Sequence, residues 1–194
     1  MKLIVVDKQH DFCNPFGKLY VNGAELRVPV IEQAIRSGEF DEVIFTVDWH
    51  TPADKSFIPN GGPWKPHCCQ YSVGAAIMPG LIEAVVEMGI SYQVFLKGDN
   101  PEHEEYGAFE KKRSAGENVI LYNFSKTSKV TIPKDTEFVV AGVAGDYCVV
   151  ETLKNLIKLG FSPKVFMAGI EFIDKESNVI NELGLETWEI PSKE

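Results

Sequence analysis

The sequence predicts an α/β fold of three layers, in which a mainly parallel central sheet is covered by helices on both faces. Short, nearly continuous apolar runs alternate with segments of helical periodicity along the 194 residues. Such runs are typical of parallel strands that are buried on both faces, and their alternation with helices is typical of βαβ units. We therefore expect ligands to bind at the carboxyl ends of the strands.

Each element is predicted from its own pattern. The predicted strands are residues 2–6, 42–47, 92–96, 137–143 and 164–168, with an alternating run at 185–190 that favours an edge strand. The predicted helices are residues 25–37, 80–88 and 149–159. The last helix is strongly periodic and stops at Gly160, a common helix end.

The chain is predicted to form one domain over residues 1–194, because its length suits a single core. Residues 111–133 interrupt the alternation. They combine a basic start, a short apolar piece and a connection rich in Ser, Thr and Lys. We interpret them as an inserted or rearranged loop, in which either a short helix or a hairpin would fit.

Composition excludes several classes of function. The 28 acidic and 19 basic residues give a net charge of -9, whereas nucleic-acid binders usually have a basic surface with a positive charge. No apolar run approaches the about 18 residues of a membrane span, and the start MKLIVVD is too short for a secretory signal. The four cysteines include no CxxC pair, so no disulfide framework or zinc knuckle is indicated. We expect a cytoplasmic protein that binds neither nucleic acid nor membrane, with a homo-oligomer left open.

Polar, reactive residues follow four of the predicted strands. Asp7, Asp48 and Lys97 come directly after strands, and Cys148 lies just beyond residues 137–143. Cys148 also begins a helix, whose N-terminus can lower a thiol pKa and offer amides to an oxyanion. Asp7 can then act as general base and acid, and Lys97 can stabilise a thiolate. Taken singly, each has an ordinary alternative: an inert cysteine, a capping aspartate and a solvated lysine.

The histidines suggest a metal site. His50 follows Asp48 by two residues, so both side chains point to the same side of a strand end. With His67 they form a mixed oxygen and nitrogen set that suits zinc, manganese or iron. His103 is interpreted as an ordinary loop histidine.

Three aromatic residues lie close in sequence to these polar residues. Phe12, Trp64 and Tyr106 are singly more typical of a core or a surface. Together they would provide flat apolar walls for a small aromatic ligand.

Five motifs, in order and at fitting spacing, resemble the nicotinamidases of the isochorismatase-like cysteine hydrolase superfamily. They are VVDKQHDF at 5–12, VDWH at 47–50, WKPHCCQ at 64–70, KGDNPEHEEYGAF at 97–109 and GVAGDYCV at 142–149. Residues 111–133 fall outside the resemblance, and the part beyond about residue 170 matches it only loosely.

The resemblance implies a set of catalytic roles. Asp7, Lys97 and Cys148 fall where the family has its catalytic triad, and Cys148 would form a thioester with the acyl group of the substrate as ammonia leaves. Val143 and Ala144 fall where the family has a cis peptide. The amides of Ala144 and Cys148 would be the oxyanion-hole donors.

It also implies a pocket and a metal. Phe12, Trp64 and Tyr106 match positions that line a pyridine pocket, and the matched metal ligands are Asp48, His50 and His67. One divalent ion is expected, zinc by preference over manganese or iron, holding the pyridine nitrogen. No organic cofactor is expected.

One position departs from the family pattern. Nicotinamidases usually have another His a few residues after the Asp-x-His pair. Here Asp54 stands at that place in the common spacing, and Ser56 in a longer one. Our hypothesis is that Asp54 supplies the missing metal ligand, directly or through a water.

The implied activity is hydrolysis of nicotinamide to nicotinate and ammonia in NAD salvage, with pyrazinamide as a second substrate. A related cysteine amidohydrolase that acts on another small amide or a carbamoyl compound is the alternative. An isochorismatase proper is disfavoured, because that reaction does not need the cysteine. The third reading is a non-catalytic binding protein on the same fold.

Overall fold

Five parallel strands form the central sheet of the computed structural model, which describes residues 1–192. They are β1 (Lys2–Val6), β2 (Glu42–Asp48), β3 (Ser91–Lys97), β7 (Phe138–Val143) and β8 (Lys164–Glu171), in the order β3-β2-β1-β7-β8. The apolar runs of β1, β2 and β7 are buried on both faces, which is why these strands lack a polar-apolar alternation, whereas the edge strand β3 exposes Tyr92 and Val94. The predicted mainly parallel sheet is confirmed.

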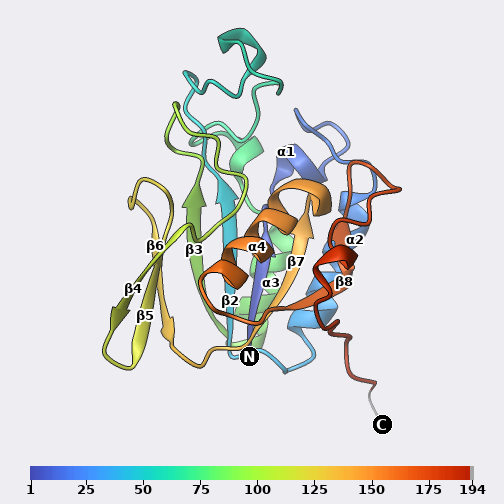
Figure 1. The fold of residues 1–194 in the computed structure, drawn as a ribbon. Helices are drawn as coiled ribbons and strands as arrows, with labels where there is room; N and C mark the ends of the chain where they lie inside the picture. The colour runs from blue at the N-terminus through green and yellow to red at the C-terminus, as the bar shows by residue number, and fades with distance from the viewer. Residues whose placement is uncertain (193–194) are drawn as a thin grey trace.

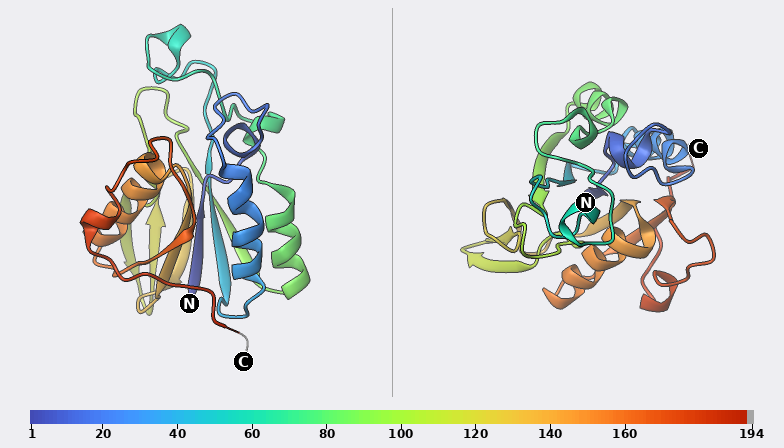
Figure 2. Two further views of the ribbon diagram at one scale, coloured as in Figure 1. Left: turned by 90° about the vertical axis from the view of Figure 1, so that its right-hand side faces the viewer. Right: turned by 90° about the horizontal axis from the view of Figure 1, so that it is seen from above.

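Helices cover both faces of the sheet (Figure 2, left). On one face lie α2 (Ala24–Ile35) and α3 (Pro79–Met88), and on the other lies α4 (Val150–Lys158). α3 begins with Pro79, whose missing N–H costs nothing in a first turn, and ends at Gly89 in the left-handed conformation. The three layers that the sequence predicts are therefore present.

Shorter helical pieces complete the chain. They are α1 (His10–Cys13), the 3-10 turns η1 (Ile58–Asn60), η2 (Val73–Ala75) and η4 (Asn181–Leu183), and the π-helical turn η3 (Gly145–Val149), which leads into α4. Among residues 1–192 no helix is long and apolar enough to cross a membrane.

Residues 111–133 form a small antiparallel sheet, so of the two alternatives the strand pairing is the one adopted (Figure 1). Its strands are β4 (Lys111–Ala115), β5 (Asn118–Tyr122) and β6 (Lys129–Pro133), in the order β4-β5-β6. The buried side chains of β5 and β6 join the same core as α4, and β6 lies against β3. This sheet covers the part of the second face that α4 leaves open.

The predicted edge strand at residues 185–190 is reduced to one bridge between Thr187 and Val165. Trp188 N–H donates to Val165 O at 2.8 Å. The Trp188 ring then packs against Phe40 and Phe166, each at 5.0 Å between ring centroids. Because this ring is buried in the core beside α2, the chain leaves the sheet after the single bridge.

The register of the sheet brings the reactive residues to one edge. Asp48 at the end of β2 is paired with Lys97 at the end of β3, and Val6 at the end of β1 is paired with Gly142 of β7. A Cβ atom on Gly142 would lie 2.2 Å from Val6 O, so only glycine fits where β7 approaches β1. Asp7 follows β1 directly, and Cys148 lies in the turn η3 just after β7.

Candidate active site

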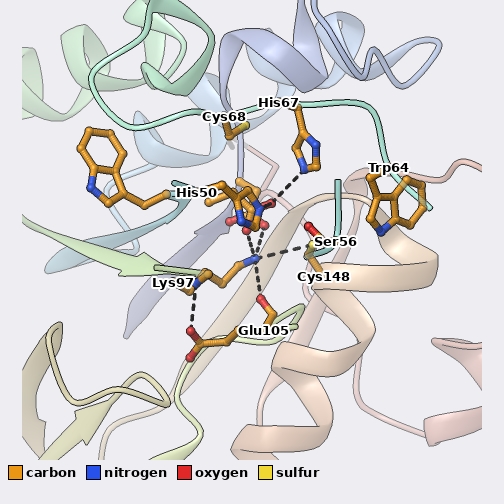
Figure 3. A network of polar contacts seen from close by, with 12 residues as sticks. His50, Ser56, Trp64, His67, Cys68, Lys97, Glu105 and Cys148 are labelled. Atoms are coloured by element: carbon orange, nitrogen blue, oxygen red, sulfur yellow. Dashed lines mark hydrogen bonds and ion pairs between the residues drawn. The ribbon is translucent and has the colours of Figure 1, made fainter. Parts of the chain in front are cut away.

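A buried ammonium group lies at the centre of the site (Figure 3). Lys97 Nζ is 2.8 Å from Asp7 Oδ2, forms an ion pair with Asp48 Oδ1, and lies 3.7 Å from Cys148 Sγ. The structure thus brings together Asp7, Lys97 and Cys148, from the ends of β1 and β3 and the turn after β7. Two carboxylates and a thiol around one cation allow a proton to move between sulfur and oxygen while the charge stays compensated.

Asp7 is held in place by its neighbour on β2. Thr46 Oγ1 donates to Asp7 Oδ1 at 2.6 Å, and Asp7 N–H donates to Thr46 O at 3.2 Å. Asp7 adopts a left-handed backbone with φ 47°, which is uncommon for a residue other than glycine. Burial raises the pKa of Asp7, although Lys97 opposes the rise. A carboxyl with a raised pKa is suited to accept and return a proton.

Burial acts in opposite directions on the pKa values of Lys97 and Cys148. Burial favours neutral Lys97, but the carboxylates of Asp48 and Asp7 outweigh it and hold the Lys97 pKa well above its usual value. Burial raises the pKa of the Cys148 thiol well above its ordinary range, although Lys97 opposes this. The expectation that the helix N-terminus lowers this pKa is therefore not met, because desolvation prevails and Asp7 and Asp48 add to it. The resting sulfur is a thiol that needs a base.

The turn before Cys148 has an unusual backbone. The peptide bond between Val143 and Ala144 is cis, as the resemblance predicts. Ala144 O then accepts hydrogen bonds from Tyr147 N–H at 3.1 Å and Val149 N–H at 3.0 Å. These bonds hold Cys148 at the π-helical turn η3, with Ala144 and Cys148 both on the wall of one cavity.

A candidate metal centre adjoins the ion pair. Asp48, His50 and His67 are buried and place ligand atoms within 4.8 Å of one another. Asp48 Oδ2 is 3.4 Å from His50 Nε2 and 3.7 Å from His67 Nε2. Burial would lower the His50 pKa, but Asp48 and Asp54 raise it to about 10, which shows how strongly this site favours positive charge. One carboxylate and two imidazoles suit a divalent metal ion.

Asp54 lies outside this group of three. Its Oδ2 is 2.8 Å from His50 Nδ1, and its Oδ1 accepts from Ser56 N–H at 2.8 Å. Both oxygens are therefore turned away from the position that the ring's Nε2 faces. Ser56 Oγ is buried without a hydrogen-bond partner among the described residues, and Ser56 does not line the cavity. The sequence pattern could not show this, since spacing does not tell which ring nitrogen an acid approaches.

A second group, Asp7, Asp48 and Cys148, also lies within ligand distance. Lys97 Nζ contacts all three side chains, so a cation already occupies the space between them. The chemistry of this group is proton transfer, and the first group remains the candidate metal centre.

A narrow cavity that is partly open to solvent connects the thiol with the candidate metal centre. The predicted aromatic residues Phe12, Trp64 and Tyr106 all line it, and Trp64 Nε1 donates to Tyr106 OH at 2.9 Å. The lining residues that the sequence did not single out are Leu19, Val21, Glu104, Tyr147 and Ile173. Glu104 and Tyr147 lie inside matched motifs, so the motifs could have identified them as lining residues. Nothing in the sequence distinguished Leu19, Val21 or Ile173.

Gln9 is a further residue that sequence analysis missed. Its Nε2 donates to Asp48 O at 2.9 Å, and its Oε1 accepts from Asp48 N–H at 2.8 Å. A single side chain thereby fixes both backbone groups of Asp48. Gln9 lies in the VVDKQHDF motif, so the motif carried the information. His103, in contrast, stacks on Phe124 at 3.6 Å between centroids and takes no part in the site.

Comparison with known proteins shows which proteins this chain is similar to. No protein-family model matches the chain. The nicotinamidase of Saccharomyces cerevisiae is 27% identical, over 93% of this chain and 92% of the relative. PnC1 from L. infantum, solved in complex with nicotinate, is 29% identical with a TM-score of 0.76, covering 96% of this chain and 91% of that one. The pyrazinamidase of Pyrococcus horikoshii, solved in complex with zinc, is 25% identical with a TM-score of 0.72, over 94% and 93%.

The fold and the buried thiol, ammonium and carboxylate are those expected of a cysteine hydrolase that acts on amides. The chain is similar to nicotinamidases and a pyrazinamidase over nearly its whole length, which supports the resemblance that its motifs predicted.

Proposed function

We propose that this chain hydrolyses nicotinamide to nicotinate and ammonia, with pyrazinamide as a second substrate. One observation carries the proposal: Cys148, in contact with Lys97, opens onto a cavity that also holds aromatic walls and the candidate metal centre. The likeness to a protein solved in complex with nicotinate supports it, because nicotinate is the acid that nicotinamide hydrolysis yields.

In the first half-reaction we assign the proton transfers to Asp7. Asp7 takes the proton of the Cys148 thiol, the sulfur attacks the carboxamide carbon, and Lys97 at 3.7 Å stabilises the developing thiolate. The carbonyl electron pair moves to oxygen, where the backbone N–H groups of Ala144 and Cys148 are proposed to hold it. The carbon–nitrogen bond then breaks, and Asp7 returns its proton to the departing ammonia. A thioester remains on Cys148.

The second half-reaction repeats these roles with water. Asp7 takes a proton from a water molecule as its oxygen attacks the thioester carbon. The new tetrahedral intermediate collapses with breakage of the carbon–sulfur bond, and Asp7 protonates the released sulfur. The product leaves as nicotinic acid, which gives its remaining proton to the released ammonia or to water and becomes nicotinate, and Cys148 is again a thiol.

The residues Asp48, His50 and His67 are proposed to hold one divalent ion, zinc by preference, with manganese and iron as the other candidates. When bound, it would supply a Lewis acid for the pyridine nitrogen of the substrate. The likeness to a zinc-bound pyrazinamidase supports this choice. Phe12, Trp64 and Tyr106 are proposed to orient the ring from the cavity wall.

An ammonia-release assay tests the proposal. Nicotinamide and pyrazinamide are expected to release ammonia, more slowly after treatment with a chelator, and an N-carbamoyl compound is expected to be a poor substrate. Cys148→Ala should abolish release while metal binding persists; activity within about tenfold of wild type would reject Cys148 as the nucleophile. A preference for the carbamoyl compound would instead identify a related amidohydrolase. The role in NAD salvage and the cytoplasmic location stay predictions.

A further inference from the structure

The small antiparallel sheet contacts the active site through its β5–β6 turn, residues 123–128. This turn lies against residues 98–105, the loop that follows Lys97 (Figure 1). Leu96 N–H, next to Lys97 on the edge strand β3, donates to Ser128 Oγ at 2.9 Å. Asp99 accepts from Asn123 Nδ2 at 3.2 Å and from Thr127 Oγ1 at 2.5 Å.

The carboxylate of Glu105 is a further, buried link between the turn and the loop. Its side chain is almost fully buried, at 1% exposure. Oε2 accepts from Gly98 N–H at 2.9 Å, and Oε1 accepts from Phe124 N–H at 2.7 Å. Burying a carboxylate is costly unless its oxygens are hydrogen-bonded. Each oxygen of Glu105 has such a donor, one from the loop and one from the turn.

The backbone of Glu105 contacts the centre of the site. Lys97 Nζ donates to Glu105 O at 3.3 Å, in addition to its ion pairs with Asp7 and Asp48 (Figure 3). Among these partners of Lys97, the Glu105 carbonyl is the uncharged hydrogen-bond acceptor. Because the Glu105 side chain anchors this segment at Gly98 and Phe124, it also determines where the carbonyl meets the ammonium.

We propose that Glu105 is a positioning residue, through which the β4–β6 sheet holds the ammonium of Lys97 against Cys148. The inference rests on the proposed function for the role of Lys97. It gives residues 111–133 a task in the reaction, since Phe124 belongs to the turn between β5 and β6. The competing explanation is that Glu105 only closes the loop, in which case its loss affects stability and leaves the rate per folded molecule unchanged.

Glu105→Gln is the decisive variant. A glutamine has one acceptor oxygen, so its NH2 group would face a backbone N–H of either Gly98 or Phe124. We expect kcat to fall by about 10- to 100-fold, as displacement of a catalytic group by about 1 Å does. KM and metal content should stay near wild-type values. Glu102→Gln is the matched control, because Glu102 lies in the same loop but forms an exposed pair with Lys55.

A second variant guards against failure to fold. Thr127→Val removes an exposed hydroxyl that joins the turn to Asp99 without touching Glu105. It should lower kcat in the same direction by a smaller factor. Wild-type kcat in a folded, metal-loaded Glu105→Gln protein, or a loss explained wholly by lower folded or metal-loaded fractions, would overturn the proposal.

The reaction of Cys148 with iodoacetamide separates this proposal from the proposed function. The alkylation needs no amide substrate, and a nearby ammonium speeds it by stabilising the thiolate. We expect slower alkylation in Glu105→Gln than in wild type or Glu102→Gln. If wild type released no ammonia from nicotinamide, the proposed function would fail while this difference still supported positioning. Equal alkylation rates would count against positioning alone.

Discussion

Asp54 Oδ2 lies 2.8 Å from His50 Nδ1, so Asp54 orients a candidate metal ligand from behind. The other ring nitrogen of His50, Nε2, faces Asp48 Oδ2 at 3.4 Å. An acid on one imidazole nitrogen fixes the tautomer and leaves the other nitrogen free to bind a metal. At the place where the motif resemblance predicts another histidine, this chain has Asp54, which is positioned to orient His50.

Asp54→Ala should therefore weaken zinc binding by about 10- to 100-fold, the usual effect of losing such a partner. Competition with a chromogenic chelator measures the affinity. Ser56→Ala is the control, since Ser56 Oγ has no hydrogen-bond partner among the described residues and its loss should leave affinity unchanged. Equal affinity in Asp54→Ala and wild type would contradict the orienting role, and loss in Ser56→Ala would make Ser56 a ligand.

Gly98→Ala should impair both stability and metal binding. Gly98 has φ +72°, and a Cβ there would lie 2.7 Å from His50 Cε1. The left-handed backbone alone costs a residue with a side chain about 1–2 kcal/mol. Gly89→Ala is matched to it, with φ +63° and nothing within 4 Å of the added Cβ. Urea unfolding should show a loss in both variants, and zinc titration a loss only in Gly98→Ala; unchanged zinc affinity there would refute the predicted displacement of His50.

Thr46→Val tests the support of Asp7. The variant removes the hydroxyl that donates to Asp7 Oδ1 at 2.6 Å. A hydrogen bond to a carboxylate contributes about 1.5–3 kcal/mol, so the free energy of unfolding should fall by that order. Thr136→Val, which removes an exposed hydroxyl bonded to Pro133 O, should change it by less than about 0.5 kcal/mol. Equal urea midpoints for both variants would show that the Thr46 hydroxyl does not stabilise Asp7.

Lys8 makes stability depend on pH. Its Nζ donates to Ala24 O at 2.9 Å, and burial lowers the Lys8 pKa to about 8. In the unfolded chain a lysine has a pKa of about 10.4. Between these values the unfolded state binds more protons, so the cost of burying Lys8 is complete below about pH 8 and is relieved as pH rises towards 10.

Lys8→Met removes this cost together with the hydrogen bond. The variant should exceed wild type in unfolding free energy at neutral pH by roughly 1–3 kcal/mol, and the difference should shrink as pH rises. Urea unfolding at several pH values between 7 and 10 measures it. A difference that stays constant with pH would mean that Lys8 does not titrate in this range.

The sequence was informative where chemistry follows directly from a strand. Asp7, Asp48 and Lys97 could be placed together because the ends of parallel strands share one edge, and this needs only the strand bounds. The β4–β6 sheet was not predictable to the same degree. The buried residues Val119, Ile120 and Leu121 of β5 form too short an apolar run to identify a strand, and the segments on either side are polar, as in loops.

The raised pKa of Cys148 shows a second limit. A helix N-terminus can be read from the sequence, but the desolvation that outweighs it depends on packing from distant segments. Ile173 lines the cavity from beyond β8 for the same reason, without any motif of its own. The local sequence pattern therefore shows which titratable side chains come together, and the tertiary packing around them determines whether they are charged.

The pairing of Asp48 with Lys97 across β2 and β3 has a consequence for how this protein tolerates change. Side chains alternate between the faces of a strand, so a one-residue slip of β3 would turn Lys97 to the opposite face. Asp7, Asp48 and Cys148 would then lose their common cation. An inserted or deleted residue is tolerable in the helices and surface loops, but within β1, β2 or β3 it would abolish activity even in a chain that still folds. Selection for activity therefore also preserves the register in which β1, β2 and β3 pair.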